Sequence, residues 1–464
     1  MNNKPREHWG SRIGFLMAAA GSAIGLGTLW KFPYVTGENG GGAFVAVYIV
    51  CMLFIGLPIF IAELMLGRQA QKGAVMTFST VLGHNSPWKI AGWLGVISSF
   101  FIMSFYSVIA GWGLNYILMC LNQFYVGKTP QEIEAIYETL AHSGDITLFW
   151  HFLFTAITVG VVYPGIREGI EYWSKLMTSL LFVIVVGLFC YNLTLDGLDD
   201  ALRFILYPDF SKLKPSGILE ALGLAFFTLS LGQGIMITYG SYMRRQDDLP
   251  KTSLMVASMV AVVSILCAFV IFPVLFTFGL PPQGGPGLVF KTLPLLFAKL
   301  PGALFISVAF FTLFVFTALT SSIALVEVVV ATCMDLYGWS RKKAALLVGS
   351  ATAIFGIPSA LSASSTLFAN WPVLYGKSFF RTVDELVSVW LLPIGGLLIA
   401  IFMGWVVNKE LCKAEFESET AYKWLFKPWL FFIKWIAPVA IILIIAQQAE
   451  IINLDKVFYF ARRN

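Results

Sequence analysis

The feature that most constrains the fold is a series of eleven apolar stretches, each long enough to form a helix that crosses a bilayer. Roughly 20 apolar residues are needed, because the hydrocarbon core is about 30 Å thick. The stretches begin near Ile13, Ala43, Ile90, Leu148, Ile170, Ile218, Ser253, Leu304, Ala344, Val387 and Phe431. Charged residues make up only 12% of the chain, about half the usual fraction of a soluble protein. The sequence therefore predicts an all-α polytopic membrane protein without a soluble domain.

The basic residues predict how the chain is oriented in the membrane. Those on one predicted side are Arg6, Arg12, Arg68, Lys72, Arg167, Arg244, Arg245, Arg341, Lys342, Lys343 and Lys423. Because basic loops stay in the cytoplasm, we expect a multi-pass protein of the cell (inner) membrane with a cytoplasmic N-terminus. The odd number of spans then puts the C-terminus outside. The basic residues are dispersed, which argues against a nucleic-acid partner.

Two of the apolar stretches are interrupted at corresponding places in the two halves of the chain. The first contains Gly21-Ser22-Ala23-Ile24-Gly25-Leu26-Gly27, and the sixth contains Phe227-Thr228-Leu229-Ser230-Leu231-Gly232-Gln233-Gly234. Glycine weakens a helix, so backbone groups at mid-membrane depth can be left without helical partners. Lipid cannot satisfy such groups. Gly21 and Gly25 alone would also suit close helix packing, but the second interruption favours the binding site of a secondary transporter.

Longer motifs around these interruptions resemble the neurotransmitter:sodium symporter family. The similar segments are Arg6-Glu7-His8-Trp9, Gly21 to Gly27, Lys31-Phe32-Pro33, Glu38 to Phe44, Phe226 to Gly232 and Thr320-Ser321-Ser322-Ile323-Ala324, within a resemblance that runs from Arg6 to about Trp405. It implies the LeuT-type fold, with two inverted five-helix repeats and broken first and sixth helices. In a single domain, residues 1–464, the repeats would cover about 8–195 and 215–408, with an extra helix at about 428–448. The resemblance also implies sodium-driven uptake of amino acids or related amines.

The same resemblance implies a substrate site between the two interruptions. The amides of Leu26 and Gly27, at the start of a half-helix, would bind a carboxylate together with the Tyr106 hydroxyl. The ammonium group would be bound by the carbonyls of Ala23, Phe227 and Thr228 and by Ser230. The substrate side chain would contact Ile102, Phe227, Gln233, Ser321 and Leu325. Most of these residues suit an aliphatic or aromatic neutral amino acid, whereas Gln233 is also compatible with a polar substrate.

The second sodium site of the family is complete in this sequence. The resemblance implies carbonyl ligands from Gly21, Ile24 and Thr317 and hydroxyl ligands from Thr320 and Ser321. Hard cations prefer oxygen ligands, and an all-neutral shell suits a monovalent ion. Hydroxyls in membrane helices more often bond back to their own helix, but their spacing to the broken helix favours sodium binding here.

The first sodium site departs from the family. Its remaining ligands would be Ala23, Thr28 and Thr228, with the substrate carboxylate, because Thr28 replaces the usual asparagine in helix one and Val260 replaces that in helix seven. We therefore expect a weakened or absent first site, and one coupled sodium ion rather than two. Tyr48, Thr228 and Ser264 match a chloride site, but Leu224 replaces its glutamine, which argues against chloride dependence.

Charged residues within spans cost roughly 2.5–3.5 kcal/mol each on insertion scales, so each should have a function. The resemblance implies an outer gate formed by Lys31 and Asp384 together with Tyr106 and Phe227. It implies an inner gate formed by Arg6 and Asp335 with Trp9 and Tyr242. Lysine lacks the bidentate fork of arginine, so the outer pair is expected to be looser.

Other functions have less support in the sequence. Neither HExxH nor GxSxG appears, so a membrane enzyme is not expected, and the lack of GxxxxGK[ST] argues against an ATP-driven pump. The predicted function is a symporter that imports a neutral amino acid with sodium, acting as a monomer or weak homodimer. The alternatives are an exchanger, a symporter coupled to another ion, or an amino acid sensor that does not transport.

Overall fold

Two of the predicted spans are broken helices, and both breaks fall within the glycine-containing interruptions. The computed structural model describes residues 6–83, 86–282, 286–364, 367–368 and 370–452. In the first span, α1 (Arg12–Ala23) ends before a bend of 49°, and the span continues as a π-helical turn (Gly27–Lys31) and α2 (Phe32–Glu38). In the sixth span, α11 (Pro215–Thr228) is separated from α12 (Ile235–Gly240) by a non-helical segment.

The break in the sixth span follows from backbone conformation. Ser230, Gly232 and Gly234 all have positive φ angles, of 55°, 74° and 72°. This left-handed region is open to glycine but costs other residues energy, and a helix cannot continue through it. The glycines at 232 and 234 therefore end α11 and allow the chain to restart as α12. Ser230 is held in the same region by the surrounding structure.

The other spans are long helices. Among the described residues, nine helices are long and apolar enough to cross a membrane, and the bent first span makes a tenth. The second to fifth spans are α3 with α4 (Gly42–Ala70), α6 (Lys89–Leu121), α8 (Gly144–Val162) and Ile166–Asn192, which includes α9 (Tyr172–Asn192). The later spans are α13 (Leu249–Thr277), α15 (Ala303–Tyr337), α16 (Arg341–Ala360), α18 with α19 (Phe379–Val406) and α21 with α22 (Lys423–Gln448). With α11 and α12 as the sixth span, the all-helical prediction is confirmed.

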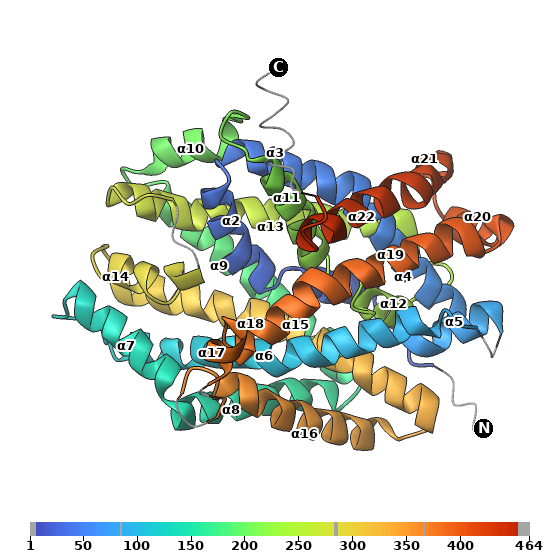
Figure 1. Cartoon of the computed structure of the whole chain (residues 1–464), viewed down its shortest axis with the longest axis horizontal. Coiled ribbons are helices and arrows are strands. Elements are labelled where there is room, and N and C mark those ends of the chain that lie inside the picture. The colour runs from blue at the N-terminus through green and yellow to red at the C-terminus, as the bar shows by residue number, and fades with distance from the viewer. Residues whose placement is uncertain (1–5, 84–85, 283–285, 365–366, 369, 453–464) are drawn as a thin grey trace.

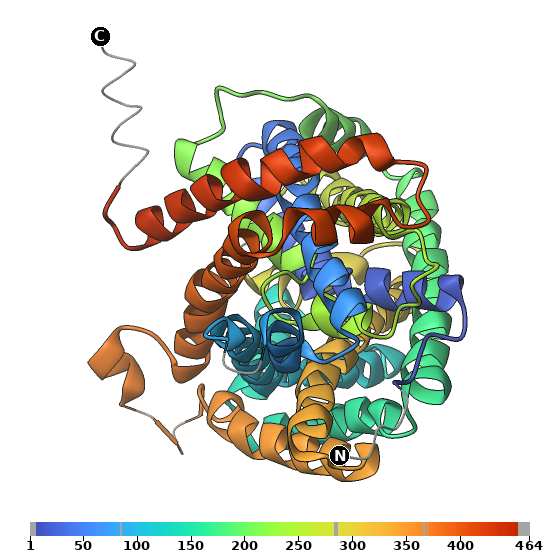
Figure 2. The same ribbon diagram turned by 90° about the vertical axis from the view of Figure 1, so that its right-hand side faces the viewer.

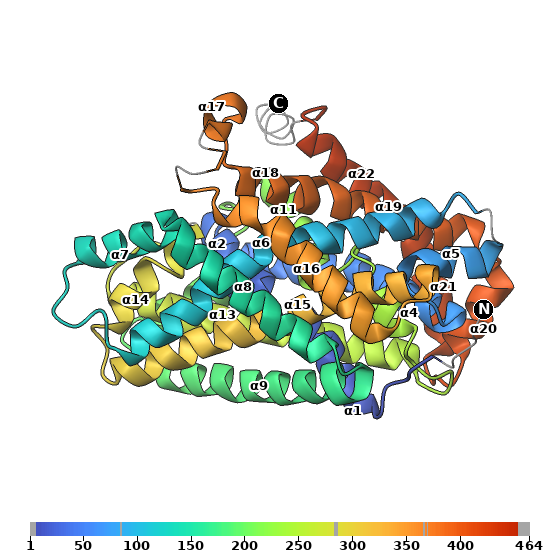
Figure 3. The same cartoon turned by 90° about the horizontal axis from the view of Figure 1, so that it is seen from below.

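Short helices lie between successive spans along the chain. They are α5 (Ala74–Leu82), α7 (Pro130–His142), α10 (Leu198–Leu206), α14 (Thr292–Phe297), α17 (Trp371–Tyr375) and α20 (Lys409–Glu417). α5 and α20 lie at the end where the N-terminus is found, and α7 and α14 lie at the other end (Figures 1 and 3). We call these the N-terminal end and the opposite end. Figure 2 shows the bundle from the N-terminal end, with many helices seen nearly along their axes.

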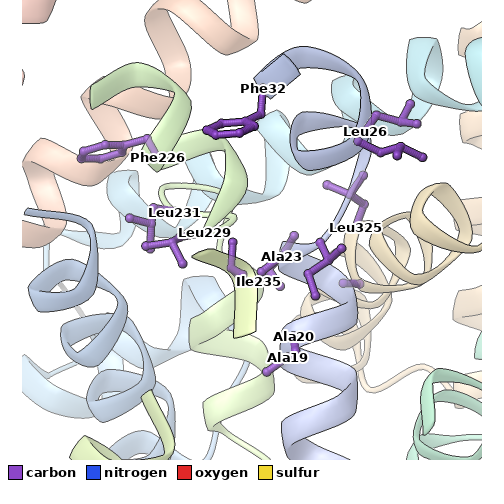
Figure 4. Packing of buried hydrophobic residues seen from close by; sticks show 14 of the residues in the cluster. Ala19, Ala20, Ala23, Leu26, Phe32, Phe226, Leu229, Leu231, Ile235 and Leu325 are labelled. Carbon is purple, nitrogen blue, oxygen red and sulfur yellow. The ribbon is translucent and has the colours of Figure 1, made fainter. Parts of the chain in front are cut away.

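The two breaks lie in the middle of the bundle. α15 packs against α1, α6 and α9, and it thereby brings the eighth span beside the break in the first. Apolar side chains from three spans surround the breaks, among them Ala23 of α1, Leu229 between α11 and α12, and Leu325 of α15 (Figure 4). This packing places unpaired backbone and a few polar side chains inside the protein, away from lipid.

Candidate functional site

Side chains from neighbouring helices satisfy part of the exposed backbone at the two breaks. The carbonyl of Ser22 accepts hydrogen bonds from the hydroxyls of Ser230, at 3.1 Å, and Ser321, at 2.9 Å. The first break is thus tied to the sixth and eighth spans. A buried unpaired backbone group in a membrane protein is costly, so these bonds stabilise the non-helical conformation that the site requires.

The break in the sixth span has two further supports. The amide of Gly232 donates a 2.8 Å bond to the carboxylate of Glu63 in α4. The carbonyl of Gln233 accepts a 2.7 Å bond from the hydroxyl of Ser99 in α6. The second and third spans therefore hold the segment between α11 and α12 in place.

A cavity lies between the two breaks. It is small, with a volume of about 20 Å³, and is lined by Ser22, Ala23, Gly25, Leu26, Gly27, Ile102, Tyr106, Phe227, Ser230, Gln233, Ile235, Ser321 and Leu325. Ten of the eleven residues predicted to bind substrate line it, and Thr228 does not. The cavity wall carries hydroxyl, amide and apolar groups but no charged side chain. Such a wall suits a ligand with no net charge.

Tyr106 stands where the resemblance places it. Its hydroxyl accepts a 3.2 Å hydrogen bond from the amide of Leu26 and is also bonded to the hydroxyl of Ser321. Gly25 is required beside it, because a Cβ at this position would lie 3.1 Å from the Tyr106 oxygen and 2.5 Å from that of Ser321. The amide and the phenol predicted to bind a carboxylate therefore lie together at the cavity wall.

Three of the five residues predicted for the second sodium site are joined by hydrogen bonds. The hydroxyl of Thr320 lies 2.8 Å from the carbonyl oxygen of Gly21 and 3.2 Å from that of Thr317. Two carbonyls and a hydroxyl so close together form part of a neutral oxygen shell, which fits a hard monovalent cation. Ser321 instead donates to Ser22, and no hydrogen bond joins Ile24 to this group in the described part of the chain.

The residues predicted for the first sodium site are less well joined. The hydroxyl of Thr28 lies 3.5 Å from the carbonyl oxygen of Ala23. The hydroxyl of Thr228 bonds instead with Tyr48, at 2.8 Å, and with the carbonyl of Leu224 in its own helix, at 2.9 Å. Val260 is fully buried and offers no side-chain oxygen.

The residues compared with a chloride site form a small hydroxyl cluster. Tyr48 lies 2.8 Å from Thr228 and 3.3 Å from Ser264. The side chain of Leu224 is buried and apolar. The hydroxyls thus bond to one another and to their own helices, so the cluster is satisfied by the protein alone.

All four residues predicted for the inner gate come together at the N-terminal end. The guanidinium of Arg6 makes bonds of 2.8 and 2.7 Å to the two oxygens of Asp335, and it lies 4.7 Å from the centre of the Tyr242 ring. The amide of Trp9 donates to the carbonyl of Tyr242 at 3.1 Å. Burial lowers the pKa of Arg6, but Tyr242 and Asp335 raise it more, so the net shift is upward. The Arg6 guanidinium therefore stays charged, and the four residues pack together at this end of the bundle.

A second ion pair adjoins this gate. Arg341 makes bonds of 2.7 and 3.1 Å to Glu327, and the hydroxyl of Tyr242 donates to the same carboxylate at 2.5 Å. Tyr242 therefore touches both pairs, through its ring on one side and its hydroxyl on the other. The sequence alone does not indicate that Glu327 and Arg341 form this pair.

The residues predicted for the outer gate are not joined in the same way. The ammonium of Lys31 lies 5.1 Å from the centre of the Phe227 ring. Asp384 accepts a 2.8 Å bond from Ser388 in its own span. Within the residues that the structure describes, no ion pair links Lys31 to Asp384. The two charged residues predicted for the outer gate are thus not paired with each other in this structure.

Ser22, Gly25 and Ile235 also line the cavity, although the sequence interpretation does not include them in the substrate site. Ser22 and Gly25 lie inside the first interruption, and Ile235 directly follows the second. Their position in or next to the breaks could have identified them, because every residue near a non-helical segment can present backbone or side chain to the same space.

The fold and the two facing helix breaks define a helical secondary transporter with its binding cavity between broken spans. The model of the Sodium:neurotransmitter symporter family matches residues 6–129 and 122–461. The chain therefore belongs to this family, which confirms the resemblance found in its sequence. The family consists of transporters rather than enzymes.

Individual relatives agree with this assignment. An uncharacterized sodium-dependent transporter of Bacillus subtilis, YhdH, is 37% identical over 454 residues, covering 98% of this chain and 100% of that protein. The sodium-dependent dopamine transporter of Caenorhabditis elegans is 27% identical over 463 residues, covering 86% and 72%. The crystal structure of MhsT in complex with L-phenylalanine is similar with a TM-score of 0.85 and 40% identity, covering 95% of this chain and 99% of that one. The LeuT fold and sodium-dependent transport are thereby established for this chain at the level of its family.

Proposed function

We propose that this protein imports a neutral amino acid together with sodium by alternating access. The observation that carries the proposal is the cavity between the two breaks. It combines backbone groups and hydroxyls suited to a zwitterion with a wall that bears no charged side chain. A carboxylate would bind the amides of Leu26 and Gly27 and the hydroxyl of Tyr106. The ammonium would bind the carbonyls of Ala23, Phe227 and Thr228 and the hydroxyl of Ser230.

Sodium would bind at the second site, on Gly21, Ile24, Thr317, Thr320 and Ser321. Ile24, one of these ligands, lies in the break that follows α1, next to the backbone that faces the substrate. One non-helical segment therefore contacts ion and substrate together, so binding of the ion favours the backbone conformation that binds the substrate. We propose one coupled sodium ion, no chloride, and a monomer or weak homodimer as the functional unit.

The two ends of the bundle would act as alternating gates. Arg6, Asp335, Trp9 and Tyr242 close the N-terminal end, which we place in the cytoplasm from the distribution of basic residues. Lys31, Asp384, Tyr106 and Phe227 would close the opposite end over a bound substrate. The C-terminal residues lie outside the described part of the chain, and their placement outside the cell remains a prediction.

Uptake into proteoliposomes tests this function. Purified protein would be given a mixture of labelled amino acids, with an inward sodium gradient or an equal choline gradient. We expect a neutral amino acid to accumulate only with sodium. Equal uptake in choline would indicate an exchanger or another coupling ion, and substrate binding without accumulation would indicate a sensor. Either result would contradict the proposed symport of an amino acid with sodium.

A further inference from the structure

Gln233 occupies an unusual position in the cavity wall. The part of the wall that would face a substrate side chain is otherwise mainly apolar, formed by Ile102, Phe227, Ile235 and Leu325. Gln233 brings a carboxamide to this wall, and its exposed fraction is only 4%. A carboxamide carries two N–H donors and an acceptor oxygen, so its burial is favourable only when a partner is available.

The backbone of Gln233 is fixed, so its side chain starts from a defined point. Its carbonyl is bonded to Ser99 at 2.7 Å. Gly232 and Gly234 on either side have the positive φ angles that end α11. α6 packs closely here, because a Cβ on Gly95 would lie 2.9 Å from the nitrogen of Gly234 and 3.1 Å from the carbonyl carbon of Gln233. The third span thus sets the position of residue 233.

The carboxamide of Gln233 makes no hydrogen bond within the described part of the chain, and its polar atoms are not completely buried, which agrees with their facing the cavity. Ser22, which also lines the cavity, has a buried hydroxyl without a partner among the described residues. The hydroxyls of Tyr106, Ser230 and Ser321 in the same wall are already engaged, the first with the Leu26 amide and the other two with the Ser22 carbonyl. Two polar side chains without a partner among the described residues therefore line the cavity.

We propose that this transporter selects amino acids with an uncharged, hydrogen-bonding side chain, and that Gln233 is the residue that recognises this group. The inference rests on the proposed function and narrows its substrate class. A site with a buried polar group discriminates strongly against an analogue that lacks the matching group, because the protein's own group is then left unpaired. A charged side chain is excluded because the wall offers no opposite charge.

Isosteric pairs of amino acids test the inference directly in the unaltered protein. Tyrosine is compared with phenylalanine, and threonine with valine, as competitors of sodium-driven uptake. The tyrosine pair is included because L-phenylalanine is the ligand in the crystal structure of MhsT. We expect the polar member of at least one pair to have a kcat/KM at least tenfold higher. Equal values in both pairs, or a preference for the apolar members, would overturn the inference.

Two variants then assign the preference to one side chain. Gln233→Met keeps the length of the side chain but removes its hydrogen-bonding groups, so the preference should fall to less than threefold. Leu325→Met changes the same cavity without changing its hydrogen bonding, and the preference should persist. A preference that survives Gln233→Met would overturn the role of Gln233. If neither pair nor any other amino acid is taken up, the proposed function itself fails. Sodium-driven uptake without a polar preference contradicts this inference alone.

Discussion

At the scale of single residues, two threonines of the same helix show how a hydroxyl becomes available to an ion. Within the described part of the chain, the hydroxyl of Thr332 in α15 bonds only to the carbonyl of Val328, one turn back in its own helix, at 2.8 Å. Thr320 also bonds back, but its hydroxyl in addition reaches across to the carbonyl of Gly21 at 2.8 Å. The difference is the break in α1, which leaves that carbonyl without a helical partner. We therefore expect the Thr320 hydroxyl, which is shared between two helices, to be the one that binds sodium.

Replacing Thr320 by valine should therefore remove sodium dependence. The change keeps the shape of the side chain but deletes one of the oxygens beside the carbonyls of Gly21 and Thr317. We expect the apparent affinity for sodium to fall at least tenfold, equivalent to about 1.4 kcal/mol, measured from uptake against sodium concentration. Thr332→Val removes a hydroxyl from the same helix without touching the first span, and its sodium dependence should match that of the unaltered protein. Unchanged affinity in Thr320→Val would refute the assignment of the second site.

Most residues that line the cavity could be predicted, because the family resemblance assigned them. Several belong to the interrupted segments themselves, whereas Ile102, Tyr106, Ser321 and Leu325 are on the unbroken helices α6 and α15 and could be placed by the resemblance alone. What sequence could not supply is the partner of each side chain. The ammonium of Lys31, for example, contacts the ring of Phe227 and does not pair with Asp384. Such pairing depends on the distance between two helices that are far apart in the sequence.

At the scale of elements, most span positions could be read from hydropathy, and the exceptions have a physical cause. The first nine spans begin within a few residues of expectation, as Arg12 against Ile13 and Ala303 against Leu304 show. The tenth begins at Phe379 and not near Val387. Its first turns carry Arg381, Asp384 and Glu385, so an apolar window excludes them although they continue the helix. The same holds for the basic start of the last span at Lys423.

The short helices were not anticipated, and α20 has a specific role in packing. The guanidinium of Arg68, at the end of α4, is fully buried. It bonds to the Glu415 carboxylate at 2.5 Å and carbonyl at 2.6 Å in α20, and to the Asp247 carbonyl at 2.5 Å before α13. One side chain thus joins α4, α20 and the loop between α12 and α13 at the N-terminal end.

Glu415→Ala should destabilise the protein, because it leaves the buried guanidinium of Arg68 without a counter-charge. Removing one member of a buried ion pair costs roughly 3–5 kcal/mol of the free energy of unfolding. We expect a loss of about 3 kcal/mol, because Glu415 is partly exposed. The measurement is the midpoint of thermal unfolding in detergent. Glu417→Ala changes a carboxylate of the same helix that has no ion pair within the described residues, and it should leave the midpoint unchanged. Equal midpoints for the two variants would show that the pair contributes no stability.

At the scale of the whole molecule, the number of coupled ions sets how steeply substrate can be concentrated. A tenfold sodium gradient supplies about 1.4 kcal/mol per ion, and 100 mV adds about 2.3 kcal/mol per charge. One ion therefore sustains roughly 500-fold accumulation of a neutral solute, and two ions sustain roughly the square of that limit. The first sodium site bears on this directly, since Val260 offers no oxygen and the Thr228 hydroxyl is bonded to Tyr48.

We accordingly predict one sodium ion per transport cycle. Uptake should rise with sodium concentration with a Hill coefficient near one. If the membrane potential is held at zero with a tenfold sodium gradient, accumulation of the substrate should stop at about tenfold. Two coupled ions would instead allow about a hundredfold accumulation. The zero-potential condition separates ion number from electrical driving force, because only the chemical gradient then acts. A Hill coefficient near two together with accumulation well beyond tenfold would mean that Ala23, Thr28 and Thr228 bind a second ion despite the loss of both asparagines.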